Sequence, residues 1–403
     1  MRISTAQIYD RGVDGIERQQ STLSRTQMQI ASGKRIGTPS DDPVGAAQSV
    51  ALAQAKNRVA QYGANIDTAK DALAQNDSVL GQIGDVLQSV RTLAVTAGNP
   101  ALNDRDRASL AADAAGKLQE LLTLANTRDG DGRYLFSGYA SDTQPFAADA
   151  GGAIAYSGDQ GQRTLEVAPG RSLPVAYNGS AALMQVKSGN GSFAAAPVAG
   201  NAGSGVISAG TVTNPALLPG DSYQLKFNVV AGATTYDVLD VTTGTTVSAG
   251  NAYSSGAAID VAGMQVAVSG APAAGDSFTL APSSSQSVFQ TVRDLIATLG
   301  TVTGSMAGNA KLQNGLNGAL TNIDQALDHV LAVRADAGAG LHELDTLSTG
   351  NADRTLQYDQ TLSRINDLDY NQALSDFARQ QVALDAAQKS FAKVSGLSLF
   401  AYL

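Results

Sequence analysis

Several residue types that support chemistry are missing or scarce in this chain. Its 403 residues include no cysteine and no tryptophan, and only two histidines. Without cysteine the chain can form neither disulfides nor thiolate zinc sites, and two histidines leave little material for imidazole catalysis. Charged residues make up 16% of the chain, with 27 basic and 36 acidic side chains and a net charge of −9. Since no lysine–arginine cluster interrupts this acidic balance, we expect no nucleic-acid partner.

Long apolar runs are also missing. No stretch approaches the roughly 18 consecutive apolar residues that read as a membrane helix, so we expect no membrane span. The opening sequence, MRISTAQIYDRGVDG, lacks the apolar segment of an ordinary signal peptide. These features do not separate a cytoplasmic protein from one that a dedicated machine exports.

Two fragments resemble metal motifs but lack required ligands. The DGDG sequence at 129–132 opens like a calcium loop, yet an EF-hand needs glycine at position six and glutamate at position twelve. This chain has Tyr134 and Ala140 there. The His-Glu pair at 342–343 begins like a zinc-protease motif, but Thr346 stands where the second histidine belongs. We therefore predict a turn at 129–132, no metal, no cofactor and no enzymatic activity.

Apolar residues recur every seven positions in both outer thirds of the chain. One row is Leu52, Val59, Ile66, Leu73, Leu80 and Leu87, with a second at Ala55, Tyr62, Ala69, Asn76, Ile83 and Val90. A later row is Leu316, Ile323, Val330, Ala337 and Leu344. Such heptads predict a long helix from Pro43 to about residue 97, ended by the GNP sequence at 98–100, and partner helices after residue 286. A shorter helix is predicted from about 104 to 125.

The middle of the chain has a different pattern. Residues 137–285 are rich in Gly, Ala, Ser, Thr and Val. Four segments, at 223–230, 234–241, 264–270 and 277–282, alternate or favour β-branched residues and are separated by glycine-rich turns, which predicts strands. The SGNGSFAAAPVAGNAGSG sequence at 188–205 reads as a flexible loop.

These patterns predict an α plus β multidomain protein. A long helical coiled-coil or bundle rod is built from both chain ends, and an all-β domain is inserted between them. The expected parts are an N-terminal assembly helix (1–38), the N-terminal half of the rod (39–136), the inserted β-rich outer domain (137–285), the C-terminal half of the rod (286–368) and a C-terminal assembly helix (369–403).

The two terminal segments mirror each other. Each carries one apolar heptad row and a second row that contains two glutamines, as at Gln20 and Gln27. Two interpretations stay open: an ordinary intramolecular helix pair, or an assembly interface that becomes ordered when neighbouring copies arrive. The candidate interface residues are Val13, Ile16, Leu23, Ile30, Tyr370, Leu374, Phe377, Leu384 and Phe391.

The link between the first two helices is predicted to be a joint. Asp42 is a good helix cap, and Pro43 suits the first helical position. Lys34 and Arg35 could pair with Asp41 and Asp42 across the link. No partner acid or base accompanies these carboxylates, so we assign them no chemistry.

Three stretches resemble a known family. IASGKRIGTPSDDPVGAA (30–47) resembles the segment before the long helix of flagellin-like proteins. GRYLFSGY (132–139) and INDLDYNQALSDFARQQVALDAAQKSFAKVSGLSLFAYL (365–403) are similar to signatures of the hook–filament junction proteins within that family. Filament-forming flagellins usually read closer to NSAKDDA where this chain has TPSDDPV. The resemblance covers both helical arms and leaves the middle unmatched.

The resemblance implies a structural subunit of the bacterial flagellum, placed in a ring of identical copies between hook and filament. It further implies contacts with the adjoining hook-associated junction protein and with flagellin, an export chaperone, and secretion by the flagellar type III apparatus without a cleaved signal peptide. A flagellin filament subunit is the alternative within the family. An adhesive or glycan-binding module on a flagellar stem is the alternative outside it, and the aromatic content of 5% disfavours sugar stacking.

Overall fold

The computed structural model describes residues 5–218 and 220–396. The chain forms two compact units. One contains the residues up to Asn65 and from Thr346 onward, and the other spans Ile66–Asp345.

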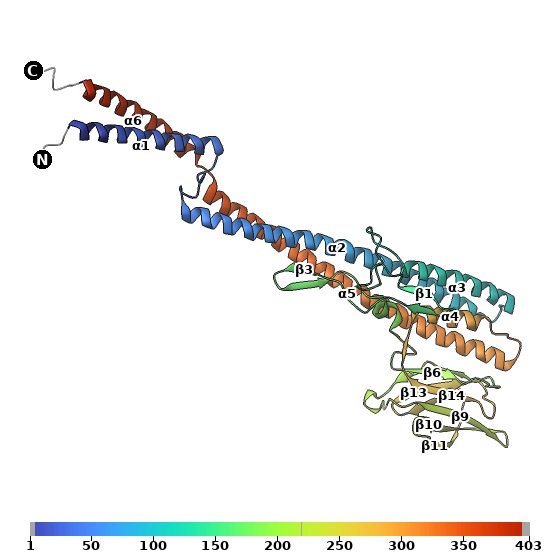
Figure 1. Ribbon diagram of the computed structural model, residues 1–403. Coiled ribbons are helices and arrows are strands. Elements are labelled where there is room, and N and C mark those ends of the chain that lie inside the picture. Colours follow the sequence, from blue (N-terminus) through green and yellow to red (C-terminus); the bar gives the residue numbers. More distant parts are fainter. Residues whose placement is uncertain (1–4, 219, 397–403) are drawn as a thin grey trace, which may run out of the picture. The chain divides into compact units, whose positions relative to one another are not determined.

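Helices come from both ends of the sequence and strands from between them (Figure 1), so the predicted fold class is confirmed. The helices are α1 (Thr5–Ser32), α2 (Pro43–Ala97), α3 (Asp104–Ala125), α4 (Val288–Leu299), α5 (Met306–Asn366) and α6 (Tyr370–Gly396). The predicted bounds of α2 and α3 are confirmed. α2 and α5 each run from one unit into the other.

Within the described residues, the strands form five small antiparallel sheets. Near the helices lie the pairs β1 (Phe146–Ala148) with β2 (Ile154–Tyr156), β3 (Thr164–Ala168) with β4 (Arg171–Pro174), and β5 (Val186–Lys187) with β15 (Ser285–Gln286). A five-stranded sheet has the order β11 (Thr245–Ala252), β10 (Ala233–Asp240), β9 (Tyr223–Val230), β14 (Ser277–Pro282) and β6 (Phe193–Pro197). A four-stranded sheet joins β12 (Ala258–Val261), β13 (Met264–Ser269) and β7 (Val206–Ile207), with β8 (Thr211–Val212) also paired to β13. Two short helices, η1 (Ser180–Met184) and η2 (Pro215–Leu217), complete the middle.

All four segments predicted as strands are strands β9, β10, β13 and β14. The predicted flexible loop at 188–205 is wrong in part, because β6 lies within it and pairs with β14 along its whole length. Its run of alanines carries no alternation, so its position beside an existing strand, rather than its own pattern, decides its structure.

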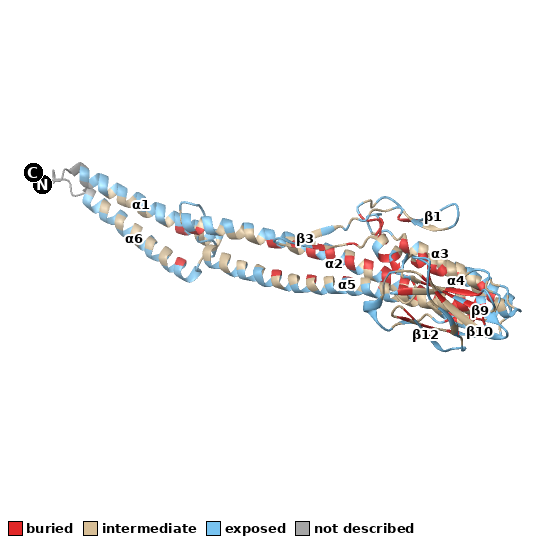
Figure 2. Cartoon of the chain, turned by 90° about the horizontal axis from the view of Figure 1, so that it is seen from below, coloured by how far each residue is buried: buried red, intermediate tan, exposed pale blue. Residues whose placement is uncertain are grey.

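Within the larger unit, the heptad rows of α2 and α5 form the centre of a helical core. Ile66, Leu80, Leu87, Ile323 and Val330 are almost wholly buried. Figure 2 shows the buried positions concentrated where α2 and α5 lie with α3 and α4, whereas α1 and α6 are largely exposed or half-buried. At about 1.5–3 kcal/mol for each fully buried large aliphatic side chain, this seam is the main stabilising feature of the helices.

Three interhelical ion pairs flank this seam. Lys70 Nζ lies 2.7 Å from Asp345, Arg334 Nε lies 2.9 Å from Asp77, and Arg91 Nε lies 2.7 Å from Asp324. In the smaller unit Lys56 pairs with Asp359. The four α2 members, at 56, 70, 77 and 91, are multiples of seven apart, so they occupy one heptad position beside the core. Exposed pairs of this kind each contribute only about 0.2–1 kcal/mol, and their main effect is to favour one antiparallel register.

The stretch predicted as one inserted domain is divided between two cores. Phe146, Leu183 and Val186 belong to the helical core, where the Phe146 ring lies 5.1 Å from that of Phe289. A second core draws on strands β6 to β14 and includes Phe227, Val268 and Phe278. We call residues 189–283 the β lobe. Residues 137–187 therefore pack with the helices, because their few large apolar side chains point into the helical core.

This division predicts different outcomes for two deletions. Ser188 N donates to Ser284 O at 2.9 Å, so a short Gly-Ser linker can replace the β lobe without stretching the chain. That variant should keep its helical content and unfold within a few degrees of the parent helical unit. Replacing 140–284 also removes Phe146 and Leu183, each worth about 2–5 kcal/mol when truncated in a core, and should lower the melting temperature by more than 10 °C. Circular dichroism melts of both variants measure this, and equal stability would contradict the assignment.

Candidate functional site: the terminal helices and their joint

In the smaller unit, α1 and α6 run antiparallel, side by side (Figure 1). Near one end the Tyr9 and Phe391 rings meet edge to face, with centroids 5.7 Å apart. A Cβ at Gly12 would lie 2.7 Å from the Phe391 ring, so glycine at this position lets the ring pack against the α1 backbone. The mirrored apolar rows of the sequence thus belong to two helices in direct contact.

The nine candidate interface residues fall into two groups. Six are partly buried: Ile16, Leu23, Ile30, Phe377, Leu384 and Phe391. The other three, Val13, Tyr370 and Leu374, are 41%, 50% and 53% exposed. The apolar rows therefore include both residues at the helix pair and residues that the pair leaves open to solvent.

Further exposed apolar residues lie on the same two helices. Val382 is 71% exposed, and Met28 and Val394 are also exposed. Sequence reasoning missed them because they stand singly on polar faces and outside the heptad rows. With Val13, Tyr370 and Leu374 they form what we call the open apolar set of α1 and α6.

Two glutamines weaken the contact between α1 and α6. Gln19 Oε1 and Gln380 Oε1 are buried, and neither accepts a hydrogen bond from any residue that the structure describes. An unpaired buried polar atom costs about 1–3 kcal/mol. A helix pair with half-buried apolar rows and such amide groups holds together less firmly than the α2–α5 seam.

The link between α1 and α2 is held by a network centred on Arg35. Its Nη2 and Nε atoms donate to Ile365 O at 2.7 and 3.0 Å, and Nη2 lies 3.2 Å from Asp42 Oδ2. Asp42 Oδ1 accepts from Gly45 N at 2.9 Å, as expected for a helix cap before Pro43. Arg35 thus ties the start of α2 to the end of α5.

Of the two ion pairs predicted at this joint, the pair between Arg35 and Asp42 is confirmed. The pair between Lys34 and Asp41 is wrong. Asp41 pairs with Arg25, at 3.6 Å, instead of with Lys34. The backbone of Lys34 is used for a bridge to Asp367, so this residue is fixed by main-chain pairing between the two linkers. Sequence spacing did not reveal Arg25, because its partner lies across a turn whose geometry the sequence leaves open.

Both acids of the joint are held in the ionised form. Asp41 Oδ2 accepts from Thr38 N at 2.8 Å and from Gly37 N at 3.1 Å. Hydrogen bonding from the Thr38 amide lowers the pKa of Asp41 below its usual value. The Gly45 amide, with Arg35 beside it, likewise lowers the pKa of Asp42. Both carboxylates are thus occupied by backbone amides and an arginine, and their role at the joint is to hold the backbone of the link in place.

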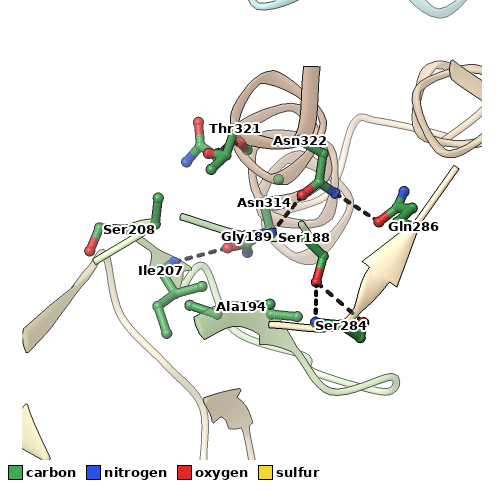
Figure 3. Close-up of a pocket in the computed structure, with 15 residues that line it drawn as sticks. Ser188, Gly189, Ala194, Ile207, Ser208, Ser284, Gln286, Asn314, Thr321 and Asn322 are labelled. Carbon is green, nitrogen blue, oxygen red and sulfur yellow. Dashed lines mark hydrogen bonds between the residues drawn. The ribbon is translucent and has the colours of Figure 1, made fainter. Parts of the chain in front are cut away.

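In the larger unit, a cavity of about 280 Å³ lies between the β lobe and α5 (Figure 3). Its walls carry amide and hydroxyl groups and small side chains. Most of these polar groups already bond within the chain: Asn322 Oδ1 accepts from Gly189 N at 2.8 Å, and Ser188 Oγ accepts from Ser284 N at 3.0 Å. The cavity therefore offers few free groups to a ligand and mainly marks the contact between lobe and helix.

Motifs set aside in the sequence keep structural roles. Asp129 Oδ1 accepts from Asp131 N and Arg133 N at 3.0 and 2.9 Å, so the DGDG sequence is the predicted turn. Glu343 forms a two-bond ion pair with Arg171, at 2.7 Å for each bond. Over residues 5–218 and 220–396 no group of three or more His, Asp or Glu side chains is placed to hold a metal, and no helix is long and apolar enough to cross a membrane.

Comparisons with known proteins agree with this architecture. Residues 3–141 match the family model of the bacterial flagellin N-terminal helical region. Flagellar hook-associated protein 3 of Salmonella typhimurium is 30% identical over 401 residues, covering 99% of both chains. The chain belongs to the flagellar hook-associated protein 3 family.

Two further relatives show how far the likeness extends. The structure of the flagellar junction protein of Legionella pneumophila is 33% identical, covers 79% of this chain and all of that one, and superposes with a TM-score of 0.73. A flagellin of Listeria monocytogenes is 28% identical over 127 residues, which is 32% of this chain. The resemblance read from the motifs is thus confirmed, and the flagellin alternative matches a third of the chain only.

Low pH should weaken the hydrogen bonds that Asp41 and Asp42 accept from backbone amides at the joint. A carboxylate whose folded pKa is lowered stabilises the fold above its unfolded pKa, about 3.9 for Asp, and that stability is lost as pH falls through the folded value. We therefore expect the Thr38 and Gly45 amides to be protected from hydrogen exchange at neutral pH, and to lose protection below about pH 4 before α2 unfolds. NMR exchange measurements across this range check the prediction. Protection that stays unchanged until α2 itself unfolds would contradict it.

Proposed function

We propose that this chain is the structural subunit that joins the flagellar hook to the flagellin filament. The observation that carries the proposal is the relationship to hook-associated protein 3 over 99% of both chains. It extends through both terminal helices and through the β-rich middle, whereas the flagellin match covers 32% of the chain. A full-length match favours the junction role over that of a filament subunit.

We further propose that α1 and α6 carry the assembly interface. Copies of the chain pack through the open apolar set, in a ring that contacts the adjoining hook-associated junction protein on one side and flagellin on the other. This proposal is supported by exposed apolar side chains on both helices and by the weak contact between them. Burying such side chains against neighbours contributes about 25 cal/mol per Å² of apolar surface.

The remaining parts of the proposal concern delivery and location. The subunit reaches the outside of the cell through the flagellar type III apparatus, without a cleaved signal peptide and with an export chaperone. It acts as an extracellular part of the flagellum and has no enzymatic activity. The assembly helices at 1–38 and 369–403 stay predictions of the same kind, whereas the predicted part at 137–285 is divided between the helical core and the β lobe.

Val382 provides the most direct test of the assembly interface. In a strain that lacks the chain, the wild type should restore filaments, and Val382→Asp should leave hooks bare with flagellin shed to the medium. A carboxylate buried in a contact between copies costs several kcal/mol, enough to weaken association more than 100-fold. Because Val382 is 71% exposed, the free subunit should keep its melting temperature within about 2 °C. Electron microscopy of the cells and thermal melts of the purified variant give both readouts.

Gln119→Asp is the control, because it adds the same charge at an exposed polar position of α3, outside the two terminal helices. It should restore filaments. Secretion of each variant is measured first, since an export chaperone could contact the same residues. Normal filaments built from secreted Val382→Asp would exclude this face of α6 from the interface. Normal filaments in the strain without any copy of the chain would overturn the junction role itself.

A further inference from the structure

The β lobe contacts α5 through asparagine side chains and without a shared apolar core. The apolar residues of the helical core and those of the β lobe form two separate clusters. Between them lie the cavity of about 280 Å³ and a larger one of about 690 Å³, both lined mainly by small or polar residues. Asn314 lines both cavities. It therefore lies between the two cavities, where the β lobe touches α5.

Asn314 bonds the lobe as a neighbouring strand would. Its Oδ1 accepts from Ile207 N at 2.9 Å, and its Nδ2 donates to Gly205 O at 2.9 Å (Figure 3 shows the first bond). A side-chain amide presents the same donor and acceptor as a peptide group, and residues two apart on a strand present their N–H and C=O on one edge. The Asn314 side chain is thus paired with the edge of β7, and the residue is only 6% exposed.

A second asparagine holds the point where the chain enters and leaves the lobe. Asn322 Oδ1 accepts from Gly189 N at 2.8 Å, and Ser188 and Ser284 are bonded to each other beside it. The chain is also covalently continuous here, through β5 and β15. Asn322 lies eight residues beyond Asn314 on α5, which is about 12 Å along a helix. The neck at Ser188 and Ser284 is therefore a fixed attachment, and Asn314 is a separate, breakable one.

We propose that Asn314 is a latch that holds the β lobe against α5, and that the lobe swings about the neck when this latch opens. Opening exposes no apolar core, because neither hydrophobic cluster crosses the contact. The Ile207 amide and the Gly205 carbonyl then exchange Asn314 for water. The device lets the lobe change its position while both cores stay folded.

The substitution Asn314→Asp tests the latch with almost no change in volume. The carboxylate can still accept from Ile207 N, but it has no donor for Gly205 O and repels that carbonyl. The matched control is Asn317→Asp, which adds the same charge three residues along α5 and also lines the smaller cavity. No bond from the Asn317 side chain to the lobe appears among the described residues.

The lobe position is measured by pulsed electron paramagnetic resonance between spin labels at Thr246→Cys on β11 and Gln119→Cys on α3. Both positions are exposed, and the chain has no other cysteine. Wild type and Asn317→Asp should give one narrow distance distribution. Asn314→Asp should broaden it and raise the undocked fraction about tenfold or more, with exchange of the Ile207 amide faster by a similar factor.

Circular dichroism, together with hydrogen exchange of the β9 and β14 amides, shows whether both cores stay folded. An unchanged narrow distribution in folded Asn314→Asp would overturn the latch. Unfolding of the lobe in Asn314→Asp, but not in Asn317→Asp, would also overturn it, because Asn314 would then be part of the lobe's stability and not a separable contact.

Discussion

The antiparallel pairing of α2 with α5 is the constraint on which the other parts depend. It joins segments far apart in the sequence: the Arg91–Asp324 pair spans 233 positions. Closing so long a loop costs conformational entropy, which the buried heptad rows must offset before any other long-range contact can form. Once this seam is made, Gly33 and Arg35 of one linker can bond to Leu368 and Asn366. The residues between α2 and α5 in sequence, 98–305, have to leave from the end of α2 and return to the start of α5.

The larger and smaller units differ in how completely they bury their apolar residues. In the larger unit the heptad positions are closed off by α3, α4 and the segment around Phe146 and Leu183. In the smaller unit α1 packs against α6, and among the described residues the pair retains the open apolar set and two unpaired amide oxygens. The proposed assembly requires such a difference, because apolar side chains that are already buried within one copy cannot be buried again against a neighbouring copy.

Sequence patterns predicted the features that repeat. Heptads located α2 and its partner, alternation located β9, β10, β13 and β14, and helix-cap chemistry located Asp42. The spacing of the ion pairs along α2 also repeats by seven and could have been read in advance. The candidate interface residues were grouped by the same periodicity, and their role in assembly stays a prediction.

Features that depend on single contacts could not be predicted. Phe146 and Leu183 lie in short elements without apolar periodicity, so nothing in the sequence assigns them to the helical core instead of the lobe. The Arg25–Asp41 pair depends on the geometry of a turn. Asn314 resembles any other asparagine on α5, and its bonds to the β lobe depend on a strand edge more than a hundred positions away. Periodicity belongs to a single helix or strand and can be read from its sequence. Such contacts exist only in the folded chain, between segments that are far apart in sequence.

Hydrogen exchange of α1 and α6, in the free subunit and in assembled flagella, tests most directly whether assembly completes the smaller unit. Backbone amides of α2 and α5 in the larger unit should be equally protected in both states, because their core is closed within one copy. Amides of α1 and α6 should exchange at least about 100-fold faster in the free subunit than in the assembly, since neighbours bury the open apolar set. Equal, high protection of α1 and α6 in both states would contradict the account and make the helix pair an ordinary part of the subunit's own core.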